Sequence, residues 1–82
     1  MERIFVGAVS TPRGKIEYYL IKELCAEHGI VYGITVILEK ETAEITQITT
    51  QLHKIQELLH AMLRGSVTPV TVRDIVEDWL AQ

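Results

Sequence analysis

The chain has few of the residues that mark disordered, disulfide-rich or secreted proteins. Its 82 residues include two prolines, five glycines and one cysteine, Cys25. A single cysteine excludes an internal disulfide and fits a reducing compartment. No apolar run reaches the roughly 20 residues that a membrane-spanning helix needs. Because Glu2 and Arg3 follow Met1 directly and only a short apolar run comes after them, we expect no secretory signal peptide. We therefore expect a cytoplasmic protein that does not enter a membrane.

An excess of positive charge is also missing. Eight Lys and Arg residues stand against 11 Asp and Glu residues, for a net charge of −3, so no general attraction to phosphate backbones is expected. The 48% of hydrophobic residues suffices for a folded core. We expect one domain over residues 1–82, too small to support much strained catalytic geometry, for which association with a second chain would enlarge the core.

The first half of the chain has the pattern of antiparallel strands joined by short turns. Turn residues occupy positions 10–14, which include Pro12 and Gly14, and positions 27–29. Gly33, inside the third apolar run, marks either a bulge or a place where an aromatic ring lies against the backbone. The β-branched and aromatic residues between the turns predict three strands, over about residues 2–10, 15–24 and 30–40.

The middle of the chain supports two interpretations. Apolar residues at alternating steps of three and four, from Ile45 to Met62, fit one long helix with a heptad seam. However, six of the nine residues from 42 to 50 are β-branched, which disfavours a helix there. We therefore predict an edge strand over about residues 42–48 and a helix over about 50–64, with Thr50 as its N-cap and Gly65 as its C-terminal cap.

The last segment predicts a second helix, over about residues 71–81. Thr71 followed by Asp74 resembles a shortened capping box, and Trp79 on the apolar stripe is expected to be largely buried against the first helix and the sheet. The stripe comprises Val72, Ile75, Val76, Trp79 and Leu80. The fold class is therefore α+β, a small four-stranded and mainly antiparallel sheet followed by two C-terminal helices packed on one face.

Two stretches of the chain resemble a family of short, uncharacterised bacterial proteins, a domain of unknown function. The C-terminal stretch reads V-T-P-x4-D-x3-D-[aromatic]-L and comprises Val67-Thr68-Pro69, Asp74 and Asp78-Trp79-Leu80. The N-terminal stretch comprises Glu17-Tyr18-Tyr19-Leu20 and Tyr32-Gly33-Ile34. The resemblance implies a strands-then-helices domain in the bacterial cytoplasm. It carries over no catalytic residue and no ligand.

The polar cluster that best fits metal-ligand spacing is formed by His53, Glu57 and His60, which share one face of the first predicted helix. Glu57 and His60 have the Glu-x-x-His spacing of carboxylate-bridged metal sites in helix bundles. Such sites need further carboxylates from other helices, and this chain has one such motif. We therefore expect these three residues to form a solvated helix face and predict neither a bound metal nor a cofactor.

No catalytic constellation is complete. Cys25 and His28 could form a nucleophile and its base, but no third orienting group is indicated. The acidic residues of the last helix, Asp74, Glu77 and Asp78, are expected on its exposed side. The two helices resemble a helix-turn-helix in outline, yet the second offers only Arg73 against these three acids, so nucleic acid is not the expected partner.

The pleat of the sheet predicts a second apolar surface. If Tyr18 and its even-numbered neighbours face the helices, Tyr19, Ile21, Val31 and Ile37 lie on the opposite face, which two short helices cannot also cover. We therefore interpret the chain as a non-catalytic protein-interaction or regulatory module, acting as a homodimer or with a protein partner. A small nucleic-acid-binding regulator is the alternative interpretation, and a metal-binding protein or enzyme is the third.

Overall fold

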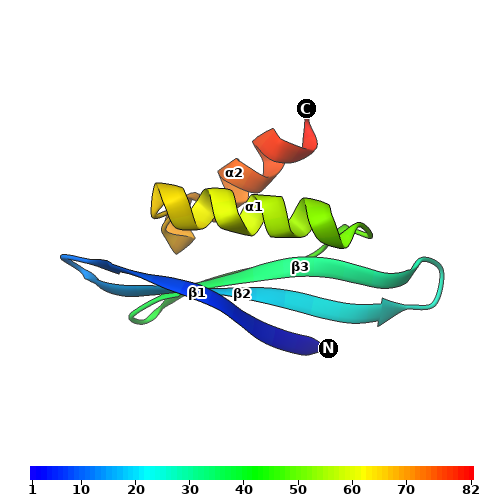
Figure 1. Ribbon diagram of the computed structural model, residues 1–82, viewed down its shortest axis with the longest axis horizontal. Helices are drawn as coiled ribbons and strands as arrows, with labels where there is room; N and C mark the ends of the chain where they lie inside the picture. Colours follow the sequence, from blue (N-terminus) through cyan, green and yellow to red (C-terminus); the bar gives the residue numbers. More distant parts are fainter.

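Four strands precede two helices in the computed structural model, which describes residues 1–82. The strands are β1 (Glu2–Thr11), β2 (Gly14–Cys25), β3 (Gly29–Leu38) and β4 (Glu41–Thr49), and the helices are α1 (Leu52–Gly65) and α2 (Pro69–Leu80). The sheet order is β1-β2-β3-β4, with every neighbouring pair antiparallel. Both helices lie on the same side of the sheet (Figure 1). The predicted α+β fold is thus confirmed.

The hydrophobic core lies between α1 and the central strands, because side chains alternate between the two faces of each strand. Ile16, Tyr18 and Leu20 of β2 face the helices, as do Ile34, Val36 and Leu38 of β3. From the helices, the core receives Ile55, Leu58, Leu59, Met62, Val72 and Val76.

The β-branched residues of 41–49 form β4, so the interpretation of residues 42–64 as one long helix is wrong.

The predicted cap of the first helix is displaced in the structure. Gln51, not Thr50, is the N-cap of α1, and it makes no side-chain capping bond. Its N–H instead donates a hydrogen bond to Thr49 Oγ1, at 3.2 Å. At the other end Ser66, not Gly65, takes the left-handed conformation, with φ 50°. Its own N–H satisfies the carbonyl of Leu63, which is the role expected of a glycine.

The second helix begins two residues before the predicted start. Pro69 is its first residue and extended Thr68 is its N-cap, an arrangement that proline favours because the first N–H of a helix needs no partner. Thr71 therefore lies inside the first turn, and its Oγ1 donates to the Thr68 carbonyl, at 3.2 Å. The capping box predicted from Thr71 and Asp74 is wrong.

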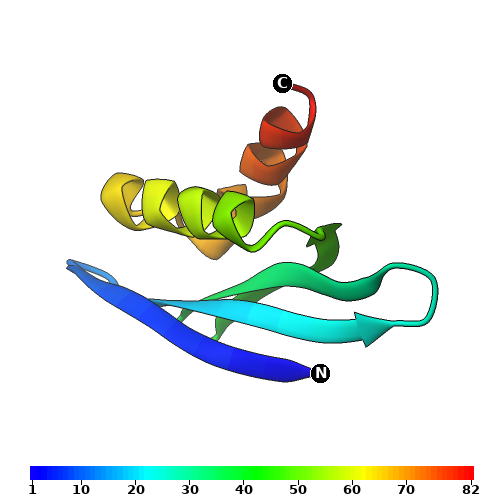
Figure 2. The ribbon, with the colours of Figure 1, turned by 45° about the vertical axis from the view of Figure 1, so that its right-hand side comes forward.

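Trp79 packs against the core but is only half-buried, so the expectation that it is largely buried is wrong. The cause is the direction of α2, which rises away from the sheet toward its C-terminus (Figure 2). Val72 and Val76 are buried, whereas Ile75 and Leu80, on the flanks of the same predicted stripe, are exposed.

A bulge in β1 changes which of its residues face the helices. Phe5 is opposite Tyr19 of β2, but Gly7 is opposite Tyr18, so Val6 is an extra residue. Gly7 faces α1, since a Cβ added there would lie 3.2 Å from the side chain of Leu63. Phe5 and Ala8 consequently share the uncovered face although their numbers differ by three.

A second irregularity lies opposite Gly33. Tyr32 pairs with Thr49 and Ile34 with Ile45, so residues 46–48 of β4 occupy the space opposite one residue of β3. A Cβ added to Gly33 would meet the backbone of β4, 2.8 Å from the Cα of Thr46. The bulge interpretation of this glycine is confirmed, and its close neighbour is backbone, not an aromatic ring.

We expect Gly33→Ala to lower the free energy of unfolding by about 2–4 kcal/mol, because β4 must move to admit one methyl group. Urea denaturation gives the measurement. Gly65→Ala is the matched control: its added Cβ would contact only the Val67 side chain, at 3.6 Å. Equal stability of the two variants would contradict the close approach.

The buried hydroxyl of Tyr18 connects the sheet to the segment between the helices. It donates a hydrogen bond to the Val67 carbonyl, at 2.7 Å, and burial raises the pKa of Tyr18 above its ordinary value of 10.0. The folded state therefore holds this proton more tightly than the unfolded state does. The resulting stabilisation is fully present below pH 10 and is lost as the pH rises through the folded-state pKa.

Tyr18→Phe removes both the hydrogen bond and this titration. We expect the variant to be less stable than the wild type by about 1 kcal/mol near neutral pH. As the pH rises above about 10, the variant should lose less additional stability than the wild type does. Urea denaturation at several pH values measures both. All other groups are the same in both proteins, so the difference between the two curves isolates Tyr18. Parallel curves would contradict this assignment.

Candidate interaction surface

The face of the sheet that the helices leave uncovered carries the four apolar residues that the sequence indicated, but they differ in exposure. Ile21 and Val31 are buried, with 1% and 6% of their surface exposed, whereas Tyr19 and Ile37 are half-buried. Ile21 stands opposite Arg3 on one side and Gly33 on the other. The centre of this face is therefore already covered by the chain's own side chains. The exposed apolar area of the face lies away from Ile21 and Val31.

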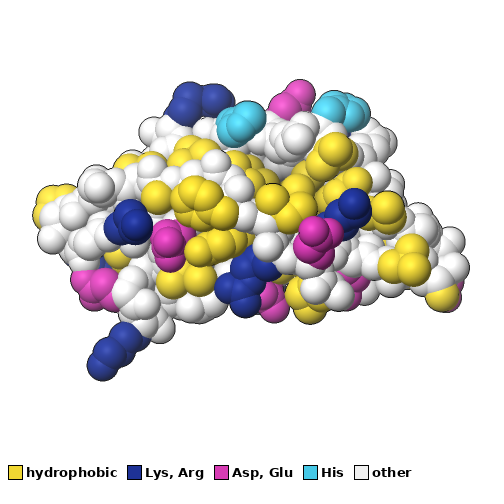
Figure 3. All heavy atoms as spheres, turned by 60° about the horizontal axis from the view of Figure 1, so that its bottom comes forward, with side chains coloured by type: hydrophobic (Ala, Val, Ile, Leu, Met, Phe, Trp, Pro, Cys, Tyr) yellow, Lys and Arg dark blue, Asp and Glu magenta, His cyan; other side chains and the backbone are white.

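An aromatic pair with a cation forms the exposed part of this face. The rings of Phe5 and Tyr19 meet edge to face, with centroids 5.6 Å apart, and the Arg3 guanidinium lies 5.5 Å from the Tyr19 centroid. Both contacts are favourable for aromatic rings. Phe5 nevertheless remains 56% exposed. Figure 3 shows apolar side chains on this side of the molecule interrupted by charges of both signs.

Exposed apolar residues also gather where the sheet extends beyond the helices. The tip of the β2–β3 hairpin projects past α1 (Figure 1), and Met1 and Glu2 line a shallow hollow with Leu24 and Ile30 of this tip. Leu24 and Ile30 are opposite each other at this tip, and Ile4 is opposite Leu20. We call Met1, Ile4, Phe5, Leu24 and Ile30 together the apolar end of the sheet. All five are exposed; Ile4, Leu24 and Ile30 lie on the helical face, and Phe5 lies on the uncovered face.

The two edge strands differ in how well they are protected. β4 carries Glu41 and Glu44, has Gln47 at φ 55° in its bulge, and packs against α2. β1 is ten residues long, contains no proline, and has its only charges, Glu2 and Arg3, at one end. Bulges, charges and covering elements are the usual protections of an edge strand. Apart from the bulge at Val6, β1 has little such protection.

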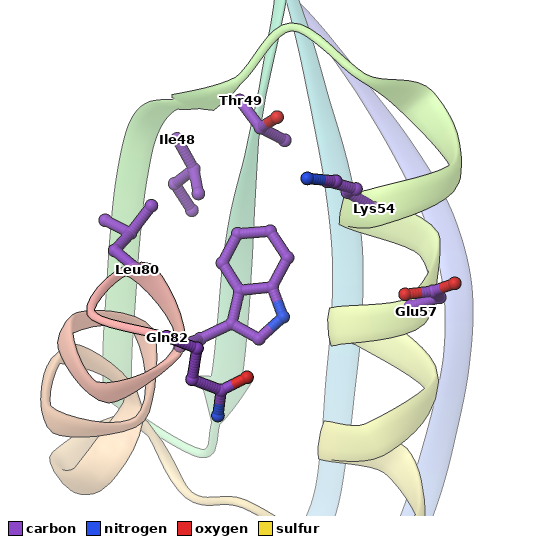
Figure 4. A pocket seen from close by; sticks show the side chains of 7 residues that line it. Ile48, Thr49, Lys54, Glu57, Leu80 and Gln82 are labelled. Atoms are coloured by element: carbon purple, nitrogen blue, oxygen red, sulfur yellow. The ribbon is translucent and has the colours of Figure 1, made fainter.

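A cleft of about 330 Å³ lies between α1, α2 and β4. In Figure 4, Lys54 and Glu57 extend from α1, Ile48 and Thr49 lie on β4, and Leu80 and Gln82 belong to the C-terminal end. The half-buried Trp79 completes the lining. The volume is at the lower limit for a small-ligand pocket. Trp79 therefore lines this cleft in addition to packing against the core.

The sequence-based metal and catalytic candidates are not assembled into a site. His53, Glu57 and His60 are exposed on α1, and no group of three His, Cys, Asp or Glu side chains in the structure could hold a metal ion. Cys25 and His28 line the same shallow hollow beside the bulge of β4. The contact of His28 is with the neighbouring carboxylate of Glu27, at 3.8 Å.

Comparison with known proteins places the chain in a family. The model of a family of unknown function, DUF6514, matches residues 6–82. The chain belongs to this family. No curated protein and no solved structure matches it. The resemblance to a family of unknown function is thereby confirmed.

Membership of DUF6514 assigns no residue a role, so the surface has to be judged by its own geometry. Sequence reasoning did not single out Phe5, because the turn at residues 10–14 by itself sets a register that would place Phe5 opposite Leu20; the bulge at Val6 places it opposite Tyr19. Leu24 and Ile30 were missed because strand patterns do not show where a covering helix ends. No helix of the structure is long and apolar enough to cross a membrane.

Proposed function

We propose that this DUF6514 domain is a non-catalytic protein-interaction module that acts as a homodimer. The observation that supports the proposal is the concentration of exposed apolar surface at the apolar end of the sheet. Nine large apolar side chains are exposed in the whole molecule, and five of them lie at this end. Exposed large apolar side chains that gather in one region of a small protein are characteristic of an association surface.

The size of the core supports a second copy as the partner. Only 17 of the 82 residues are buried, and small domains bury a small share of their surface. Association through the apolar end would add to the apolar area removed from water, worth roughly 25 cal/mol for each Å². The proposal places the homodimer in the bacterial cytoplasm, a reducing compartment in which the half-buried Cys25 stays a free thiol.

We expect light scattering at micromolar concentrations to give twice the mass of the chain, and Phe5→Lys to give a folded protein of half that mass. The lysine puts a charge where an apolar ring would be buried on association. Because Phe5 is 56% exposed, the substitution leaves the core of the monomer intact. Ile21→Lys would not serve, since Ile21 is buried and a charge there would unfold the chain.

Leu80→Lys is the matched control, because Leu80 is also 56% exposed but lies at the C-terminal end of α2. It should remain dimeric. A wild-type monomer at high micromolar concentration would contradict the proposal. A dimer dissociated by Leu80→Lys and not by Phe5→Lys would contradict the choice of surface and indicate the cleft beside Trp79.

A further inference from the structure

We propose that β1 pairs edge to edge with β1 of a second copy, antiparallel and in the register that places Glu2 opposite Thr11. The two sheets would then form one continuous eight-stranded sheet. This inference rests on the proposed homodimer and specifies how it is built. A twofold axis perpendicular to the sheet would relate the copies, so both helical layers would lie on the same face.

The backbone of β1 supports edge pairing. The strand forms hydrogen bonds with β2 on one side only, so its outer edge presents unpaired N–H and C=O groups along ten residues without proline. The other edge strand, β4, is shielded by α2 and distorted by its bulge. Of the two edges of the sheet, β1 is therefore the one that can accept another strand.

The bulge at Val6 restricts the register. Residues opposite each other in a sheet must point to the same face. The face of each β1 residue follows from its partner on β2: Arg3, Phe5, Ala8 and Ser10 lie on the uncovered face. Pairing Glu2 with Thr11 places Phe5 opposite Ala8 of the copy and Arg3 opposite Ser10, so the faces agree on both sides of the bulge.

Neighbouring registers fit less well. A shift by one residue would place Phe5 opposite Gly7 or Val9, which face the helices. A shift by two residues that pairs Glu2 with Val9 would place Phe5 opposite Val6, which packs against the core on the helical face, and would leave the last two residues of β1 unpaired. The register of Glu2 with Thr11 uses the full strand.

The opposed side chains are complementary in size and charge. The large ring of Phe5 would lie beside the small Ala8 on the uncovered face, and Ile4 beside Val9 on the helical face, so both exposed apolar residues of the strand would gain a cross-strand neighbour. Glu2 and Arg3 would meet the hydroxyl side chains of Thr11 and Ser10. No like charges are opposed in this register.

The helical layer is also compatible with this arrangement. Gly7 is next to the centre of the pairing, and Leu63 of α1 lies directly over it, 3.2 Å from the position of an added Cβ. Leu63 is half-buried in the single chain. Across the twofold axis, the two copies of Leu63 would approach each other and extend the apolar contact from the strands to the helices.

Engineered disulfides test the register. In a Cys25→Ser background, Arg3→Cys and Ser10→Cys are made as separate single variants and oxidised alone and mixed. We expect the mixture of Arg3→Cys and Ser10→Cys to form at least ten times more disulfide-linked dimer than either variant alone. The reason is that only residues opposite each other bring their Cβ atoms to about 4 Å. Mixing Arg3→Cys with Ala8→Cys is the control for the two-residue shift and should give little product.

Light scattering on the same proteins separates this inference from the proposed function. A further variant, Ile37→Lys, tests face-to-face packing of two sheets, because Ile37 is half-buried on the uncovered face away from β1. A noncovalent dimer that forms no mixed disulfide would overturn edge pairing while the homodimer stands. Dissociation of the dimer by Ile37→Lys would overturn edge pairing in favour of face-to-face packing. A disulfide formed between Arg3→Cys and Ala8→Cys would overturn the proposed register. A monomeric wild type would overturn both proposals.

Discussion

A mismatch in length between helices and strands determines most of what this molecule exposes. A helix advances about 1.5 Å per residue and a strand about 3.4 Å. The 14 residues of α1 therefore span roughly 21 Å, whereas the 12 residues of β2 span roughly 40 Å. Because α2 also rises away from the sheet, the helices cover one face over about half its length. The core forms under α1, and the hairpin tip that carries the exposed Leu24 and Ile30 extends beyond it.

Two irregularities in the strands decide how the remaining surface is arranged. The close approach of β4 to Gly33 shapes the edge that α2 covers, and this edge is charged and distorted. The extra residue Val6 shifts the alternation in β1, so that Phe5 and Ala8 share a face. Both features are bulges, yet one protects its edge and the other leaves a long pairing surface. The asymmetry between the two edges makes association through β1 physically reasonable.

The candidate chemistry of the sequence illustrates how far spacing can be trusted. His53, Glu57 and His60 share a helix face as their spacing requires, but no other element brings a further ligand to that face. Cys25 and His28 do line one hollow, although no third group completes a catalytic arrangement there. Spacing within one element places side chains on a common face, and a site needs groups from several elements.

The sequence by itself determined the strand and helix classes and the alternation of faces. The reason is that period-two patterns and the β-branched residues of 41–49 are local properties of the chain. It did not determine the ends of the helices, where Pro69 at the start of α2 and Ser66 after α1 replaced the expected caps. Only the tertiary structure decided which apolar residues are exposed. Ile21 is buried and Phe5 is not, because exposure depends on cross-strand neighbours and on where a helix from elsewhere in the chain ends.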